Sequence, residues 1–169
     1  GRLIVEAGHR RVAYLASHRY ATSEAYERGF RAALHEAGID LSDRMVDYGQ
    51  MTRFDTEDFQ ACEPYLEQRL DRLMNETDRP SALFMSFDAT AEIMFLIAGR
   101  MGLRVPEDLS IVCFGGAERK GAVMRKLAAI TVDEEQAAFE AVEMLVQMGT
   151  GRRPIQSQLE GCLPRHLRR

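Results

Sequence analysis

The sequence lacks several features that define whole classes of protein. Among its 169 residues there is no tryptophan, and the three cysteines, Cys62, Cys113 and Cys162, lie far apart. They form no C-x-x-C pair and have no histidine at zinc-ligand spacing. We therefore expect no metal, no cofactor, and reduced thiols that are mostly buried. No run of about 18 uncharged apolar residues is present, so no membrane span is expected.

An excess of positive charge is also missing. Lys and Arg number 22 against 26 Asp and Glu, which gives a net charge of -4. Proteins that bind DNA carry a basic surface, so this chain by itself is not expected to bind nucleic acid. Its 46% hydrophobic and 28% charged residues are typical of a globular protein with a buried core. The chain starts at Gly1 with no secretory signal pattern, and we expect a cytoplasmic protein that is part of a longer polypeptide.

What is present is an alternation of short apolar runs with stretches of helical period. This pattern is typical of an α/β fold, in which a parallel sheet carries helices on both faces. The apolar runs predict strands at 12–16, 45–48, 82–87, 109–114, 127–132 and 156–162. The helical periods predict helices at 25–37, 59–73, 91–101 and 134–148. The run at 109–114 does not alternate, which predicts a strand buried on both faces.

Polar residues mark the expected starts of these helices. Ser23 is the predicted N-cap of the first helix, and Asp88 or Thr90 that of the third. Asp133 begins the spacing of a capping box before the last helix. Pro64 either starts the second helix or kinks it.

Three loops follow predicted strands at the edge where open parallel sheets bind ligands, because loops and helix N-termini converge there. They are 17–23, 87–88 and 115–121. One interpretation is a small-molecule cleft; the other is that Asp88 is only a helix cap and the glycines only form turns. The glycines and lysine of the last loop fit neither a P-loop nor a dinucleotide fingerprint. No nucleophile and base stand at a motif spacing, so we expect no catalytic residue and no enzyme.

The predicted helix at 91–101 is apolar on nearly every side. Such a helix is either buried completely or also faces a partner. Both interpretations stay open, and the second makes the helix a surface for self-association. The residues assigned to that surface are Ile93, Met94, Ile97 and Met101.

Four segments match one protein family in order and spacing. They are Ala7 to Leu15 (AGHRRVAYL), Gly29 to Ile39 (GFRAALHEAGI), Arg79 to Phe84 (RPSALF) and Gly102 to Val112 (GLRVPEDLSIV). Together they resemble the effector-binding region of the LacI/GalR family of bacterial transcriptional repressors, which has the type I periplasmic-binding-protein fold. The last segment is the most specific, and the resemblance runs through nearly the whole chain.

The resemblance also implies how the chain is divided. Residues 8–130 correspond to the C-terminal subdomain of the effector-binding domain, and 131–150 to a segment that returns to the N-terminal subdomain. Residues 151–169 correspond to a C-terminal strand and a basic tail. The helix-turn-helix DNA reader, the hinge helix and most of the N-terminal subdomain of the family pattern are absent from this sequence.

The function implied by this resemblance is a ligand switch. A small molecule, often a sugar or a nucleobase, binds between the subdomains and shifts their relative orientation, which controls DNA binding by the absent head. The family dimerises through this region, which implies that the helix 91–101 and the loop 118–127 face a second copy. The alternative is a solute-binding protein of a transport system, which has the same fold and would need a secretory signal.

Several pocket positions depart from the family pattern. Tyr26 stands where many members carry an effector-binding Arg, Phe87 where they carry Asn, and Gly115 where they carry the Asp that grips a ligand hydroxyl or amine. Loss of the Arg and the carboxylate argues against an ordinary sugar site and favours an aromatic metabolite, unless Glu118 restores a sugar-like site or the pocket has closed. The predicted ligand-binding set is Tyr20, Thr22, Tyr26, Met51, Phe87, Asp88 and Gly115.

Overall fold

The computed structural model describes residues 1–50, 59–115, 121–123, 126–150 and 166–168. Within them, one sheet has the strand order β2-β1-β3-β4-β5-β6. Its first five strands are parallel, and β6 is antiparallel to β5. The strands are β1 (Val12–Ala16), β2 (Val46–Tyr48), β3 (Ala82–Met85), β4 (Ser110–Phe114), β5 (Ala128–Thr131) and β6 (His166–Arg168).

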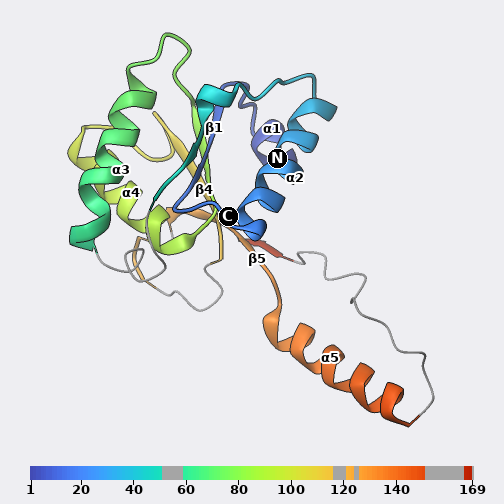
Figure 1. Cartoon of the computed structure of the whole chain (residues 1–169). Helices are drawn as coiled ribbons and strands as arrows, with labels where there is room; N and C mark the ends of the chain where they lie inside the picture. Colours follow the sequence, from blue (N-terminus) through green and yellow to red (C-terminus); the bar gives the residue numbers. More distant parts are fainter. Residues whose placement is uncertain (51–58, 116–120, 124–125, 151–165, 169) are drawn as a thin grey trace.

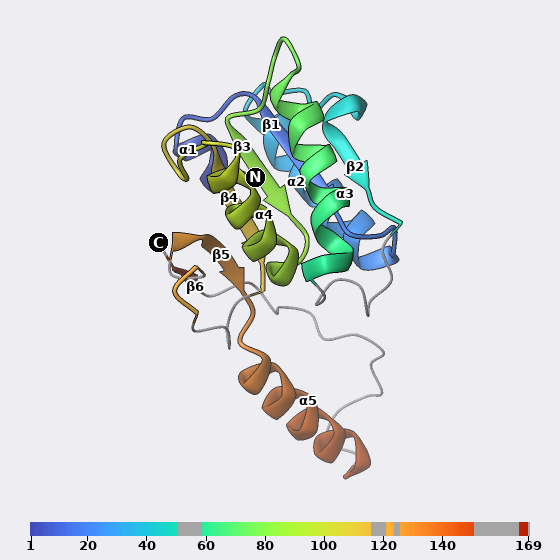
Figure 2. The same ribbon diagram turned by 90° about the vertical axis from the view of Figure 1, so that its left-hand side faces the viewer.

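Helices cover both faces of the sheet (Figure 1). The helices α1 (Arg2–Glu6) and α2 (Ala21–Glu36) lie on one face. On the other face α3 (Phe59–Met74) and α4 (Asp88–Arg100) pack side by side, as Figure 2 shows. A 3-10 turn, η1 (Asp43–Met45), precedes β2. The predicted α/β fold, with helices on both faces of a mainly parallel sheet, is confirmed.

An aromatic residue at the centre of β1 organises the core between the sheet and α2. The ring of Tyr14 is fully buried and contacts the rings of Phe30, Tyr48 and Phe84 at centroid distances of 6.3, 5.9 and 5.5 Å. Its hydroxyl donates to the carbonyl oxygen of Ser23 at 2.7 Å. The buried phenol is therefore hydrogen-bonded, as burial of a polar group requires.

The apolar residues of α4 pack against two neighbours, because the helix contacts both α3 and the strands β3 and β4 of the sheet. Met94 and Ile97 have 0% of their surface exposed, and Ile93 is buried as well. Met101 is half-buried and packs against the core. The exposed apolar residue of this helix is Leu96, at 44%. Burial within the chain therefore accounts for most of the apolar pattern.

Three details of the secondary structure differ from the sequence-based predictions. The N-cap of α2 is Tyr20 rather than Ser23, whose hydroxyl instead accepts the N–H of Tyr20 at 2.9 Å. The helix α4 already begins at Asp88, after Phe87. Pro64 lies inside α3 and does not start it. By contrast, the predicted cap of the last helix is confirmed, since the Asp133 side chain accepts the N–H of Gln136 at 2.9 Å.

The strands near the end of the chain also differ from the predictions. In β4, Ile111 and Cys113 are buried but the alternate residues Ser110, Val112 and Phe114 are only half-buried. The prediction of burial on both faces is therefore wrong for this strand, because the face toward the short helix α1 is incompletely covered. The strand predicted at 156–162 lies outside the described residues, and β6 falls in the segment predicted as a basic tail.

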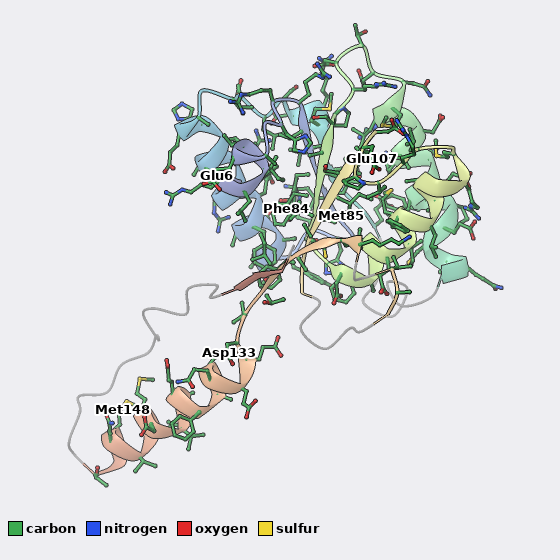
Figure 3. All side chains as sticks on the ribbon, turned by 180° about the vertical axis from the view of Figure 1, so that it is seen from behind. Glu6, Phe84, Met85, Glu107, Asp133 and Met148 are labelled. Carbon is green, nitrogen blue, oxygen red and sulfur yellow. The ribbon has the colours of Figure 1, made fainter. Side chains whose placement is uncertain are left out.

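The helix α5 (Glu134–Gly149) stands away from the rest of the molecule (Figures 1 and 2). Figure 3 shows Asp133 where α5 leaves the body and Met148 near its far end. Four large apolar side chains of α5 are about 60% exposed, and we call them the α5 stripe: Phe139, Val142, Leu145 and Val146. Among the described residues, no helix is long and apolar enough to cross a membrane.

Candidate functional site

The candidate site lies at the edge of the sheet where the parallel strands end. The strand pairing aligns Ala16 with Tyr48, and Met85 with both Leu15 and Cys113. Because the strands are parallel and in this register, the residues that follow β1, β2, β3 and β4 emerge at one edge. These following segments begin at Ser17, Gly49, Ser86 and Gly115.

Gly115 and Asp88 are in direct contact at this edge. A Cβ atom at Gly115 would lie 3.0 Å from Cγ and from Oδ2 of Asp88. Gly115 also has a φ of +111°, a conformation that residues with a side chain rarely adopt. Asp88 is only 9% exposed, and its Oδ1 accepts the N–H of Ala89 at 2.8 Å. The carboxylate of Asp88 therefore occupies the space that a side chain at position 115 would need.

An aromatic pair stands beside this contact. The ring of Tyr26 on α2 stacks on the ring of Phe114, with centroids 4.4 Å apart and an interplanar angle of 29°. Phe114 ends β4 and immediately precedes Gly115, so the stack adjoins the contact between Gly115 and Asp88. A tyrosine hydroxyl is protonated at neutral pH, and burial raises the pKa of Tyr26 further. The site thus combines a flat aromatic surface with a nearby carboxylate.

The segment 17–20 carries several polar groups at the exit of β1. The hydroxyl of Ser17 is buried and has no hydrogen-bond partner within the described residues. Burial lowers the pKa of His18, whose ring lies 3.7 Å, centroid to centroid, from that of Tyr20. Tyr20 is 53% exposed, and Thr22 is exposed on the first turn of α2. This segment offers hydrogen-bonding groups that the described part of the protein does not use.

A charged network flanks the exit of β2. The hydroxyl of Tyr48 donates to the carboxylate of Glu27, which also accepts a hydrogen bond from Arg31 at 2.7 Å. Burial opposes ionisation of Glu27, but the hydrogen bonds from Tyr48 and Arg31 hold its pKa below the ordinary value. The guanidinium of Arg19 lies 4.3 Å from the centroid of the Tyr48 ring. The loop after β1 is thereby held against the end of β2.

The predicted ligand-binding residues fall into three groups. Tyr26, Phe87, Asp88 and Gly115 belong to the connected part described above, with Phe87 as the half-buried N-cap of α4. Tyr20 and Thr22 lie at the start of α2, with Thr22 one helical turn before Tyr26. Met51, together with Glu118, lies outside the described residues. Among the residues described, no group of three side chains is placed to hold a metal ion.

The residues predicted from the sequence do not include Phe114, Arg19, Glu27 and Tyr48, which also belong to this edge. Phe114 could have been found, because it is the last residue of a predicted strand directly before Gly115. Glu27 and Tyr48 carry no such signal, since their contact depends on how α2 lies over β2.

The arrangement of these residues within a parallel sheet can be compared with known families. Residues 2–168 match the model of the periplasmic binding protein-like domain. The chain belongs to this family. The match spans all of the described strands and helices, so the periplasmic binding protein-like domain includes the whole edge described above.

The curated relatives of this domain are transcriptional repressors. The chain is 28% identical over 147 residues to the "Probable opine utilization operon repressor" of Rhizobium rhizogenes, which covers 82% of this chain and 69% of that protein. It is 27% identical over 161 residues to the HTH-type transcriptional repressor PurR of Erwinia tasmaniensis, which covers 95% of this chain and 44% of that repressor.

A solved structure has the same fold. It is a sugar-binding transcriptional regulator of the LacI family from Escherichia coli, complexed with phosphate, and it superposes with a TM-score of 0.72 at 23% identity. The alignment covers 92% of this chain and 52% of that one. At this identity the likeness shows a shared fold, while the curated relatives are transcriptional repressors. The chain spans about half of that structure and less than half of PurR.

Proposed function

We propose that the chain is the effector-sensing part of a LacI-type transcriptional repressor. The observation that supports this most is the group formed by Tyr26, Phe114, Gly115 and Asp88 at the strand ends, in a domain whose curated relatives are repressors. A small molecule would bind in a cleft between this subdomain and an N-terminal one, and shift their relative orientation. We assign no catalytic role to any residue.

DNA binding is proposed to belong to a separate head. The chain carries a net charge of -4, which does not suit a phosphate backbone. The PurR relative is of the HTH type, and this chain covers 44% of it. Because a repressor acts on DNA, we place the protein in the cytoplasm.

The effector is proposed to be flat and aromatic. The stacked rings of Tyr26 and Phe114 offer an aromatic surface, and planar rings bind to such surfaces by stacking. Gly115 provides no side chain there, while the Asp88 carboxylate can accept a hydrogen bond from a ring N–H. A polyol is held best by a bidentate arginine paired with carboxylates, and no arginine stands at position 26.

The helix α5 is proposed to return to the N-terminal subdomain. The α5 stripe exposes four large apolar side chains to water, which is unfavourable. Packing against a second subdomain would cover them. On this proposal residues 8–130 form the C-terminal subdomain, 131–150 the returning segment, and 151–169 the last strand and tail.

A homodimer contact is proposed on the outer side of α4. Since Met94 and Ile97 are buried within the chain, the contact would fall on exposed Leu96 and on the half-buried Phe95 and Met101. Leu96 is the residue on which this proposal can be tested.

The sensing role is tested by a thermal-shift screen of the full-length protein with adenine, indole-3-acetate and ribose. A ligand that binds the native state stabilises it by about 2.7 kcal/mol at 100 times its dissociation constant. We expect an aromatic compound to raise the melting temperature of the wild type and Tyr26→Ala to abolish this rise. Arg28→Ala, at an exposed position of the same helix, is the control and should show the same rise as the wild type. Stabilisation by ribose alone would contradict the aromatic effector, and no shift across a wide set of metabolites would contradict the sensing role.

A further inference from the structure

A buried carboxylate on the edge strand β2 is held by three donors from one helix. Asp47 is 8% exposed. The Tyr65 hydroxyl donates to its Oδ1 at 2.7 Å, Arg72 donates to Oδ2 at 2.9 Å, and Arg69 forms an ion pair with Oδ2 at 3.2 Å. The three donors lie four and three residues apart, so they share one face of α3. We call these four residues the Asp47 cluster, and it fixes α3 against β2.

Tyr65 is the member of the Asp47 cluster that reaches the strand ends. Gly49, the first residue after β2, donates its N–H to the carbonyl oxygen of Ala16 at 2.7 Å. A Cβ atom at Gly49 would lie 2.3 Å from the carbonyl oxygen of Ser17 and 3.0 Å from the Tyr65 hydroxyl. The Tyr65 hydroxyl therefore lies beside the backbone where β1 and β2 end. Only glycine fits at position 49, between this hydroxyl and the carbonyl oxygen of Ser17.

The protonated hydroxyl of Tyr65 is suited to a lasting hydrogen bond with Asp47. A phenol is protonated at physiological pH, and burial and the hydrogen bond to the Asp47 carboxylate raise the pKa of Tyr65 further, so its hydroxyl remains a donor. The guanidinium of Arg69 also lies 4.9 Å from the centroid of the Tyr65 ring, which restricts the ring further. The position of the Tyr65 hydroxyl is thus set by its hydrogen bond to Asp47 and by the contact of its ring with Arg69.

The backbone that Tyr65 supports leads directly into the candidate site. Ser17 begins the segment 17–20, and its own hydroxyl is buried without a partner in the described part of the chain. We propose that Tyr65 is a positioning residue of the effector site, which fixes the end of β2 against the end of β1 and so holds the segment 17–20 in the conformation that the effector meets. The reference to an effector rests on the proposed function, whereas the coupling of Tyr65 to this segment does not.

The coupling is tested by amide hydrogen exchange, which needs no ligand. Tyr65→Phe removes the hydroxyl and keeps the ring. The variant loses the hydrogen bond to Asp47, and one hydrogen bond of ordinary strength corresponds to about fivefold in exchange rate. If Tyr65 positions the ends of β1 and β2, we expect this acceleration at Gly49 and at residues 17–20. Amides of β3 and β4 should exchange as in the wild type. Unchanged exchange at Gly49 and 17–20 would overturn the proposal.

Arg100→Gln is the matched control. Arg100 pairs with Glu63 and Glu67, so this variant loosens α3 from α4 without touching Gly49. If it accelerates exchange at Gly49 as much as Tyr65→Phe does, general loosening of α3 explains the effect and the proposal is wrong. Should Tyr65→Phe fail to fold, Arg72→Gln, which leaves Asp47 two of its donors, is expected to give a smaller acceleration at the same amides.

The effector part is tested separately with adenine as the probe, in the full-length protein. Tyr65→Phe is expected to weaken adenine binding about fivefold, because part of the binding energy must then order the segment 17–20. Wild-type affinity in a variant with accelerated exchange would overturn the effector role alone. If wild-type protein binds no probe, the proposed function fails while the exchange result still decides the coupling.

Discussion

Gly115 and Asp88 illustrate how two single residues come to depend on each other. The positive φ of Gly115 turns the chain at the end of β4, and the bare Cα leaves space that the Asp88 carboxylate fills. A side chain at 115 would need a strained backbone and would also displace a buried carboxylate. Glycine at position 115 is therefore tied to the local conformation of the backbone.

Gly115→Ala is expected to lower the free energy of unfolding by about 1–3 kcal/mol, because it combines an unfavourable φ with a contact 3.0 Å from Asp88. Urea denaturation measures the change. Gly99→Ala is the control, since a Cβ there meets nothing within 4 Å, and within helix α4 it should stabilise by about 0.5–1 kcal/mol. Equal effects at the two glycines would show that this explanation is incorrect.

His9 is expected to make stability depend on pH. Burial lowers the pKa of His9 below its ordinary value, and its Nδ1 lies 2.9 Å from the Ser81 hydroxyl oxygen. The unfolded chain therefore takes up a proton at higher pH than the folded chain does. The contribution of neutral His9 is complete above the unfolded pKa of about 6.5 and is lost as the pH falls through the folded pKa.

His9→Gln should thus reduce the loss of stability between about pH 7 and pH 5. Urea denaturation at each pH measures it, with His35→Gln, at an exposed site, as the control. His18, whose pKa burial also lowers, acts in the same direction and remains in both variants. A pH profile that is the same in His9→Gln and in the wild type would contradict the assignment.

At the scale of elements, α5 depends on its cap more than the other helices do. It stands apart from the body (Figure 1), so little tertiary packing compensates for a lost cap. Asp133→Ala should destabilise the helix α5 by about 1 kcal/mol. The helical signal in circular dichroism should fall, and amide exchange should become faster within α5 alone. Asp133→Asn retains a capping side chain and should behave like the wild type. A global loss of stability in Asp133→Ala would indicate that α5 is coupled to the sheet.

The elements could be predicted from the sequence where the pattern is local. The strand β1 has the predicted bounds, and Asp133 caps α5 as predicted, because each signal lies within a few residues. Ser23 was misplaced because a serine hydroxyl serves equally well at the N-cap and three residues into the helix. The half-burial of β4 depends on what covers the sheet, which no local pattern records.

The candidate site, like the secondary structure, could be predicted from the sequence only in part. The rule that parallel strands end at one edge brought Asp88 and Gly115 together correctly. The stack of Tyr26 on Phe114 and the bond between Tyr48 and Glu27 depend on the position of α2 over the sheet. Such contacts follow from packing between distant elements, and they cannot be derived from spacing along the chain.

At the scale of the whole molecule, the α5 stripe should make the 169-residue chain self-associate. Leu145→Glu places a charge among these exposed apolar side chains and is expected to raise the dissociation constant at least about tenfold, equivalent to 1.4 kcal/mol. Sedimentation equilibrium measures this. Leu96→Glu tests the α4 surface separately, so the two surfaces are distinguished. A mass distribution that Leu145→Glu leaves unaltered would exclude the stripe as the contact.

The antiparallel strand β6 has a topological consequence. Thr131 at the end of β5 and His166 at the start of β6 are direct partners in the antiparallel ladder. The start of β6 therefore lies beside the end of β5. Neighbouring ends of antiparallel strands can be joined by a two-residue turn. The part between them, α5 included, is thus an insertion in a hairpin, which could be excised and replaced by such a turn without altering the order of the sheet.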